Sequence, residues 1–385
     1  MYFCNIFIMS IMKTIQYFLI IAVLFIQSIF SIQAQSTAGK EFWLTFSTLG
    51  WDSGAPPSSV DIQIRIVGGI SSTTGTIFFT NLGKKIDFAI QANKIYDYSL
   101  NNLEKEAVFN TVMGKNNKSI HIMTSNPVTV YSFIQGGGQF AEATIVYPVT
   151  ALGTEYYQIS HMQYPSYSAD EAYAVVATQN NTRVFHENNL VEILQAGEVY
   201  YRLSKTDMSG KYITSDAPVA FFALNRATAI PEGGYISNLM EHLAPVNTWG
   251  KTFFVPVSKF GKEIVRIIVS KSGTNILQTG GTIRTAAGGQ PLLTNLLAGQ
   301  YVDLEIFLSN NGCYIEADKP VGVCSFMESG IESVPSQSWI PGIEQTVSKA
   351  QIAPFIPTGS TKLTLHYALI ITETATKNNT LVSVG

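Results

Sequence analysis

The sequence predicts an all-β protein built from a repeated strand unit. Strands rich in Val, Ile and Phe recur at regular intervals, and polar turns containing Pro, Gly or Asn separate them. Charged residues make up only 13% of the 385 residues, whereas aromatic residues reach 11%. Helical periodicity is sparse, and residues 237–244 are the one segment that we expect to form a short helix or turn.

The first repeated element contains a proline. It occurs at residues 122–131, 213–222 and 315–324. Each copy predicts a strand, a polar turn with Asp or Asn, a Pro that cannot donate a ladder hydrogen bond, and a second apolar strand.

Two further elements alternate with the first. An apolar strand is followed by a polar turn and another strand at residues 174–185, 267–277 and 369–382. A short aromatic strand occurs at residues 42–44, 156–157 and 253–254. The repeats therefore predict a single architecture for most of the chain.

The spacing of the apolar strands suggests two architectures. Successive centres are separated by 66, 46, 45, 47, 55 and 47 residues, and they lie at Ile64, Val130, Val176, Phe221, Ile268, Val323 and Ile370. A step of roughly 46 residues is typical of one four-stranded β-propeller blade. Nearly continuous apolar strands also favour burial on both faces. The alternative is a series of tandem β-sandwiches of roughly 95 residues, each covering two steps.

The chain divides into a signal peptide, residues 1–34, and a repeat-built β-domain, residues 35–385. Lys13 precedes the apolar stretch 17–26, and cleavage after Ala34 fits a secretory signal, for which Met12 gives the most ordinary start. The apolar stretch is shorter than the roughly 20 residues of a membrane span. We expect the β-domain to be truncated, because residues 369–384 stop where their counterparts continue. The strand at residues 41–46 is expected to complete the last sheet.

Two cysteines follow the signal peptide, Cys313 and Cys324. If Asp318-Lys319 forms a two-residue hairpin loop, the two cysteines face each other across the hairpin, and an oxidising compartment allows a disulfide. They would then occupy a hydrogen-bonded pair, where the bridge is strained. Two buried free thiols are the alternative.

No enzymatic constellation is predicted. The five histidines lack metal-ligand spacing, no serine lies in a nucleophile elbow, and two cysteines do not make a zinc site. The sequence thus predicts no catalytic residue, cofactor or metal. The net charge of −3 gives no general reason to expect binding to nucleic acid. Tyr164 and Tyr167, in a Pro- and Ser-containing loop, are candidates for an exposed binding surface, because Tyr is enriched at interfaces.

Several of these segments resemble the N-terminal domain family of IgGFc-binding proteins, which is also found in bacterial surface and secreted proteins. The similarity runs from residue 39 to the end of the chain, and its most specific part is Trp249-Gly250-Lys251; the matching stretches are residues 39–44, 151–157, 175–178, 194–200, 214–221 and 241–251. The resemblance implies extracellular binding, with mucin-like or immunoglobulin-like partners, and carries no catalytic residue. Relatives often have cysteines in the region of residues 225–238, where this chain has none.

We therefore expect an exported, non-enzymatic cell-surface or extracellular adhesion module. It would recognise glycoproteins or glycans through loops of a β scaffold, without membrane insertion after signal cleavage. The first alternative is a structural spacer in a larger surface protein. The second is a secreted glycan-acting enzyme, which would require paired carboxylates that the sequence does not reveal.

Overall fold

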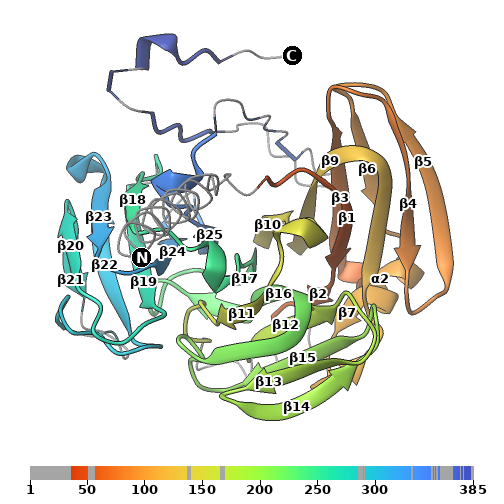
Figure 1. The fold of residues 1–385 in the computed structure, drawn as a ribbon, viewed down its shortest axis with the longest axis horizontal. Coiled ribbons are helices and arrows are strands. Elements are labelled where there is room, and N and C mark those ends of the chain that lie inside the picture. The colour runs from red at the N-terminus through yellow and green to blue at the C-terminus, as the bar shows by residue number, and fades with distance from the viewer. Residues whose placement is uncertain are drawn as a thin grey trace, which may run out of the picture. The chain divides into compact units, whose positions relative to one another are not determined.

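A computed structural model describes most of the chain after the segment predicted as a signal peptide, which lies outside the described residues (Figure 1). The description covers residues 36–50, 57–136, 140–164, 170–259, 261–284, 291–330 and 333–347, and shorter runs at 289, 350, 352, 354–355, 367–372, 374–375 and 377–382. The predicted all-β class is confirmed. The described residues contain 25 strands and one α-helix, α2 (Asn102–Val108).

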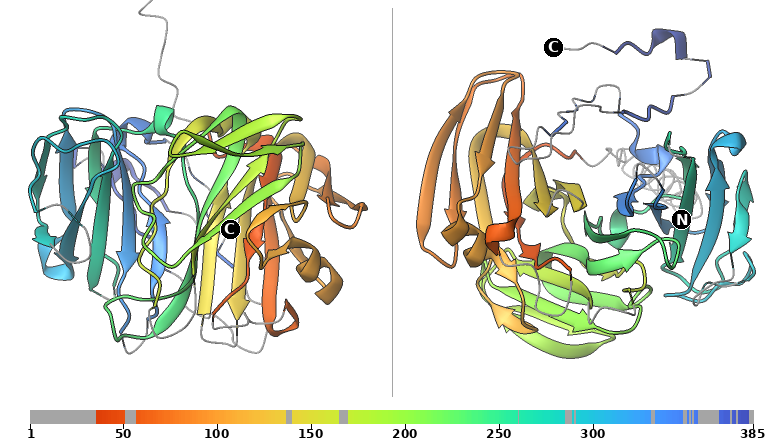
Figure 2. Two further views of the ribbon diagram at one scale, coloured as in Figure 1. Left: turned by 90° about the horizontal axis from the view of Figure 1, so that it is seen from below. Right: turned by 180° about the vertical axis from the view of Figure 1, so that it is seen from behind.

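The strands form three modules in chain order, which Figure 2 shows from two further sides. Module 1 contains β1 (Gly39–Leu44), β3 (Val60–Gly68), β4 (Thr73–Phe79), β5 (Lys84–Ile90), β6 (Ile95–Ser99), β9 (Ile120–Gly136) and β10 (Phe140–Val146). Module 2 contains β11 (Gly153–Tyr157), β12 (Glu171–Ala177), β13 (Thr182–His186), β14 (Asn189–Leu194), β15 (Val199–Ser204), β16 (Tyr212–Ala229) and β17 (Ile236–His242). Module 3 contains β18 (Thr252–Val255), β19 (Lys262–Val269), β20 (Ile276–Thr279), β21 (Thr282–Arg284), β22 (Tyr301–Phe307), β23 (Cys313–Ala317), β24 (Val321–Met327) and β25 (Ser336–Trp339).

One long strand links two half-sheets in modules 1 and 2. The first part of β9 pairs with β1 and β4, whereas its second part pairs with β3 and β10. In the same way, β16 pairs first with β11 and β13 and then with β12 and β17. In each of these sheets, the longest strand therefore changes its pairing partners midway along its length.

The predicted proline element is the point at which the partners change. Pro127 and Pro218 lie between the two paired stretches of β9 and β16, where the missing N–H removes no ladder hydrogen bond. In module 3 the strand is interrupted at Pro320, so that β23 pairs with β18 and β20 while β24 pairs with β19 and β25. The predicted hairpin at Asp318-Lys319 is wrong, because β23 and β24 belong to different sheets.

A polar side chain two residues before each proline fixes the neighbouring strand. The Ser125 hydroxyl accepts the amide N–H of Thr74 at 3.1 Å. The Asp216 carboxylate accepts the amide of Arg183 at 2.8 Å. The Asp318 carboxylate accepts the amide of Asn275 at 2.9 Å. This accounts for the polar residues of the repeat, which satisfy a backbone donor that the sheet leaves unpaired at the crossing.

A glycine turn recurs for a conformational reason. Gly197 and Gly299 have φ angles of +84° and +82°, and their amides donate to the carbonyls of Ala177 and Val269. Such positive φ values carry little strain only for Gly and, to a lesser degree, Asn. Module 1 has Asn93 at the corresponding turn, with φ of +57°.

A short 3-10 helix recurs at intervals of 97 residues. Three short 3-10 helices begin at Val149, Val246 and Ile343 and precede corresponding parts of the fold. Their starts are 97 residues apart in both intervals, so one structural repeat contains two of the 46-residue steps seen in the sequence.

An insertion in module 1 explains why the first two strand centres, Ile64 and Val130, are 66 residues apart. Helix α2, β7 (Phe109–Asn110) and β8 (Gly114–Asn116) lie between β6 and β9. Strand β7 pairs with β2 (Phe46–Ser47) in parallel, and β8 pairs with β15 of module 2. A capping box of Asn101 and Glu104 starts α2. This helix was not predicted, and residues 237–244, predicted as a short helix or turn, are instead mostly strand β17.

Two strand predictions at the ends of the domain are also wrong. Residues 41–46 do not complete the last sheet, because β1 pairs with β9 in module 1. Residues 369–371 form no strand in the structure, and their side chains are about half exposed. Their counterparts in the three modules are central strands.

The central strands are buried on both faces, as their continuous apolar character predicts. Ala174 and Val176 of β12 share a core with module 1, whereas Tyr173 and Val175 pack within a second core that includes β11 and parts of module 3. Full burial of a Val or Ile side chain stabilises the fold by about 1.5–3 kcal/mol. Contacts between modules are therefore a continuation of the hydrophobic core.

Replacing Asp216 with Ala tests the contact at the crossing. We expect the free energy of unfolding to fall by about 1 kcal/mol or less, because the partly exposed carboxylate loses its bonds to Arg183. Asp216→Asn, which keeps an acceptor, should lose less. The hydrogen bond to Arg183 lowers the pKa of Asp216, so its contribution is present above the ordinary aspartate pKa and disappears as the pH falls through the lowered value.

Urea denaturation at pH 7 measures these changes. Asp87→Ala is the matched control, since Asp87 is an exposed carboxylate in a surface ion pair with Lys85. Equal effects of Asp216→Ala and Asp87→Ala would contradict the assigned role of the crossing.

Candidate functional site

The tyrosine loop proposed as a binding surface is described only in part. The Tyr164 side chain is half-buried, and its amide donates to the carbonyl of Ala227 at 2.8 Å. Tyr167 lies outside the described residues. The structure thus anchors the start of this loop to the end of β16.

The two cysteines do not meet. Cys313 lies in β23 opposite Val255, whereas Cys324 lies in β24 opposite Arg266 and Trp339. They belong to two different hydrophobic cores, and both are buried free thiols in the structure. The failed hairpin at Asp318-Lys319 is the reason, because it alone would have placed the two residues opposite each other.

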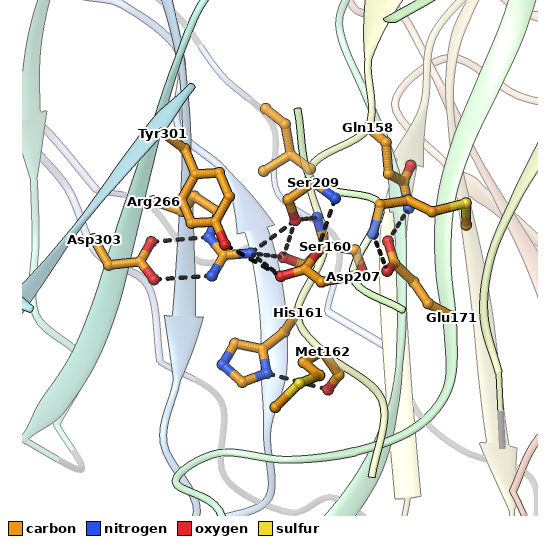
Figure 3. Close-up of polar contacts among 12 residues, drawn as sticks. Gln158, Ser160, His161, Met162, Glu171, Asp207, Ser209, Arg266, Tyr301 and Asp303 are labelled. Atoms are coloured by element: carbon orange, nitrogen blue, oxygen red, sulfur yellow. Dashed lines mark hydrogen bonds and ion pairs between the residues drawn. The ribbon is translucent and has the colours of Figure 1, made fainter. Parts of the chain in front are cut away.

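The densest polar cluster lies at the junction of modules 2 and 3 (Figure 3). Arg266 is fully buried on β19, and its Nε and Nη2 each donate to one carboxylate oxygen of Asp303 at 2.8 Å. Its Nη1 donates to the carbonyl of Ser160 and to the Ser209 hydroxyl, both at 2.7 Å. The Tyr301 ring lies 4.0 Å from the guanidinium carbon. One side chain of module 3 is thus bonded to two loops of module 2.

The charges around Arg266 shift the pKa values of its neighbours. Burial raises the pKa of the Asp207 carboxyl, but Arg266 and the hydrogen bonds from Ser209 together outweigh burial, and the net shift is downward. Burial, reinforced by Arg266, lowers the pKa of His161 to about 4. His161 is therefore neutral at pH 7. Each guanidinium nitrogen donates to a protein acceptor, which suits a clamp between modules better than a ligand site.

A neighbouring carboxylate completes this polar region. Burial raises the pKa of Glu171 well above its ordinary value. Its two oxygens accept hydrogen bonds from the Gln158 side chain at 2.9 Å and from the Met208 amide at 2.6 Å. Glu171 holds the loop that carries Asp207 and Ser209, so it supports the Arg266 cluster from within module 2.

A second buried cluster lies where β10, β17 and β25 meet (Figure 1). Burial and the nearby Glu241 raise the pKa of Glu142, and burial raises the pKa of Glu241 to about 8. Glu241 accepts the amide of Trp339 at 3.2 Å. His242 Nδ1 accepts the amide of Tyr147 at 3.0 Å, and burial lowers the pKa of His242 to about 3. These groups connect the last strands of all three modules.

The paired carboxylates that sequence reasoning did not find are therefore present but enclosed. Glu142 and Glu241 are 4% and 5% exposed. Glycosidase carboxylates must face a space that admits a sugar ring and, in inverting enzymes, a water molecule. Within the described residues, no group of three or more His, Cys, Asp or Glu side chains has metal-binding geometry.

An open groove occupies the outer face of module 1. It has a volume of about 650 Å³ and is lined by Thr74, Gly75, Thr76, Asp87, Phe88, Ala89, Met123, Thr124 and Ser125. Met123, Thr76 and Asp87 form one row across β9, β4 and β5. A Cβ on Gly75 would collide with the Phe88 ring and lie 2.6 Å from the Met123 carbonyl, so only Gly fits beneath the groove.

The groove and the buried clusters differ in what they offer a ligand. Met123 is 47% exposed, whereas Arg266 is 1% exposed and Glu241 is engaged with module 3. Sequence reasoning missed all of these residues. A charged residue inside an apolar strand, such as Arg266 in β19, is a usable signal for a buried ion pair, but hydroxyl-lined grooves have no comparable signature.

Removing the Arg266 clamp should destabilise the fold strongly. We expect Arg266→Met to lower the free energy of unfolding by about 3–5 kcal/mol, because Asp303 is left buried without its partner. Adding Asp303→Leu should recover part of this loss, since the uncompensated charge is removed. Arg183→Met, at an exposed ion pair, is the control and should cost less than about 1 kcal/mol. A loss for Arg266→Met no larger than the control would refute the clamp.

More than half of the chain is similar to known proteins. A family model described as IgGFc binding protein matches residues 142–384, which is more than half of the chain. Human IgGFc-binding protein is 25% identical over 182 residues, which cover 43% of this chain and 3% of the human protein. The chain therefore spans only a small fraction of that relative's length.

Two solved structures show weak similarity. An anti-sigma factor domain-containing protein from Clostridium clariflavum has 12% identity and a TM-score of 0.11, with coverage of 78% of this chain and 81% of that one. A structure concerning host cell-surface retention of a 1.5-MDa bacterial ice-binding adhesin has 9% identity and a TM-score of 0.13, with coverage of 80% and 98%.

The described residues include no helix with the length and apolar character needed to cross a bilayer. Modules 2 and 3, which carry the Arg266 cluster, lie wholly within the matched range, whereas all of module 1 except part of β10 precedes it. On the extent of the family match, the chain belongs to the IgGFc-binding protein family.

Proposed function

We propose that the protein is an exported binding module that recognises an extracellular glycoprotein or glycan through the groove on module 1. The observation that carries this proposal is the contrast between that groove and the buried polar clusters. The groove exposes hydroxyl groups and apolar surface together, whereas the polar side chains of the clusters form hydrogen bonds to neighbouring modules.

The chemistry of the groove suits an extended glycoprotein segment. Thr74 and Ser125 offer hydroxyls, while Met123 and Ala89 offer apolar surface. Neutral donors and acceptors beside apolar patches match the alternating polar and apolar faces of sugars and of Thr- or Ser-rich peptides. The single carboxylate of Asp87 adds an acceptor for sugar hydroxyls.

Family membership supports a binding role in the extracellular space. The human relative is named for binding IgG Fc, and that property belongs to that protein. Immunoglobulin Fc and mucins are therefore ligands to test here. Export depends on the proposed signal peptide at residues 1–34 and on cleavage after Ala34, which N-terminal sequencing of the exported protein would check.

A structural spacer is the second candidate function. Ion pairs and hydrogen bonds between modules, such as Arg266 with Asp207, favour a rigid body that could hold other domains apart. Catalysis is the weakest reading, because Glu142 and Glu241 are enclosed between strands.

We propose further that the scaffold is propeller-like, with its modules closed into a ring. The contact of β10, β17 and β25, one strand from each module, supports this arrangement. A linear series of tandem β-sandwiches is the alternative. Small-angle X-ray scattering separates the two: a closed ring of about 350 residues should have a radius of gyration near 20 Å, and a linear series should give a clearly larger value.

Binding assays test the proposed function. The exported form is tested against mucins, immunoglobulin Fc, matrix proteins and a glycan panel. We expect saturable binding to one class, lost in Met123→Arg, because the new charged side chain fills the groove. Leu190→Arg is the matched control, since Leu190 is an apolar residue of module 2 with similar exposure, 53%.

A third variant, with residues 164–167 replaced by Gly and Ser, tests the tyrosine loop. If binding is lost in this variant alone, the binding surface is the loop and not the groove. Absence of binding by the folded protein to every class would favour the spacer.

A further inference from the structure

Strand β25 has one edge that faces away from its own sheet. Among the described strands, β25 pairs only with β24, and the amide of Ile340, just after β25, donates to the Val323 carbonyl of β24 at 2.9 Å. Successive amides of a strand point to opposite edges, so the amides of Gln337 and Trp339 point away from β24. These two amides need acceptors from another part of the fold.

Two carboxyl groups from the other modules meet these amides. Strands β10 of module 1 and β17 of module 2 lie against β25 (Figure 1). Glu241 of β17 accepts the Trp339 amide at 3.2 Å. The amide of Gln337 acts as a hydrogen-bond donor to the Glu142 carboxyl of β10. Modules 1 and 2 therefore each supply one acceptor for the free edge of module 3.

The surroundings of the two carboxyls disfavour negative charge. Glu142 and Glu241 are 4% and 5% exposed, and Oε1 of Glu142 has no hydrogen-bond partner in the protein. In their own sheets they lie opposite apolar residues, Ile134 and Ala223. Burial, and then the nearby Glu241, raises the pKa of Glu142, and burial raises the pKa of Glu241 to about 8. Both carboxyls are therefore mainly protonated at neutral pH.

The other titratable groups that face this pair do not supply a compensating charge. Burial raises the pKa of Tyr147, which follows β10, and the pKa of Cys324 on β24. Burial lowers the pKa of His242 on β17 to about 3. These three side chains are neutral at pH 7. The Arg266 guanidinium, opposite Cys324 on β19, is paired with Asp303.

Ionisation of the pair changes the energy of the junction through repulsion and burial. A carboxylate accepts an amide at least as well as a protonated carboxyl does, so losing a proton does not remove the bonds to β25. Two carboxylates in one buried site, however, repel each other and lack hydration. Separation of β25 from β10 and β17 lowers this cost, because it admits water to the charges.

We propose that Glu142 and Glu241 form a proton-dependent latch that holds β25 of module 3 against modules 1 and 2. The latch is closed while the pair keeps at least one proton, and it opens when both carboxyls are ionised. The two groups titrate as a coupled pair, so the pH of opening belongs to both. The Gln337 side chain also donates to the Ile159 carbonyl of module 2 at 2.7 Å, a bond that does not titrate, so the opening is local.

The direction of the pH dependence follows from the raised pKa values. The stability that the protonated pair contributes is complete below the ordinary glutamate pKa and is lost as the pH rises through the raised value, about 8 for Glu241. Buried His161 and His242 act in the opposite direction. Burial lowers their pKa values to about 4 and about 3, so their contribution is present above the ordinary histidine pKa and is lost in acid. Loosening above about pH 7 therefore belongs to the carboxyls.

Hydrogen exchange of the whole protein tests the latch. The quantity to compare is the protection factor, which corrects each rate for the base catalysis of exchange. We expect protection of the Gln337 and Trp339 amides to fall at least about tenfold between about pH 6 and about pH 9, while β19 and β22 stay protected. In the double variant Glu142→Gln and Glu241→Gln, protection of β25 should stay constant, because an amide keeps a donor and an acceptor but does not ionise.

Glu171→Gln is the matched control. Glu171 is also a buried carboxyl whose pKa burial raises, but it is bonded to Gln158 and Met208 instead of β25. This variant should keep the loosening of β25 at high pH. Three results would overturn the latch: protection of β25 that does not change with pH, an equal loss in the double variant, or suppression of the loss by Glu171→Gln.

A second measurement applies even where the double variant does not fold. The protein is labelled with ¹³C at the glutamate carboxyls, and Glu142→Gln and Glu241→Gln assign the two resonances by NMR. We expect both to titrate above about pH 6, in step with the loss of protection at β25. Titration of both near the ordinary glutamate pKa, with β25 still protected, would reject the latch. This outcome is independent of ligand binding at the groove.

Discussion

The crossing of one strand between two half-sheets is the constraint on which each module depends. A strand that changes partners must pass through a short stretch with no ladder on either side, and unpaired backbone groups there are costly. The chain meets this constraint in two ways. A Pro at the crossing removes one donor, and a polar side chain two residues earlier accepts an amide from the neighbouring strand. The rest of the module follows, because the crossing sets which strands lie in each half-sheet.

The same constraint explains why the modules cohere. The second half-sheet of a module is covered by its own first half-sheet on one face and by a neighbour on the other, so its central strand is apolar throughout. A purely apolar face would tolerate many registers, because hydrophobic contact is non-directional. A buried arginine held by an aspartate of the adjacent strand favours a single relative position of the two modules. In that position a backbone carbonyl of the neighbouring module accepts a hydrogen bond from Nη1. Such pairs contribute little net stability, and their value here is orientation.

The sequence was informative where a local rule determined structure. The proline element, the glycine turn and the near-continuous strands predicted most central strands, with Ile64, Val130, Val176, Phe221, Ile268 and Val323 all in buried strands. It failed where partners are distant. The sequence between Cys313 and Cys324 suits a hairpin locally, and only the pairing of β23 with β18 and β20 prevents one. The groove escaped prediction for the same reason, because its row of residues comes from β4, β5 and β9.

The differences between modules show where recognition can develop on a repeated fold. Positions at the crossings and junctions are constrained in every copy, whereas the outer half-sheet is free to vary. Module 1 builds it from four strands, including the β4–β5 hairpin that forms most of the groove. In module 3, β21 follows β20 after two residues but pairs with β22, so the described outer half-sheet has three strands, β18, β23 and β20. A groove of the module 1 type therefore requires the fourth strand, and the scaffold can gain or lose such a surface in one module without disturbing the contacts that hold the modules together.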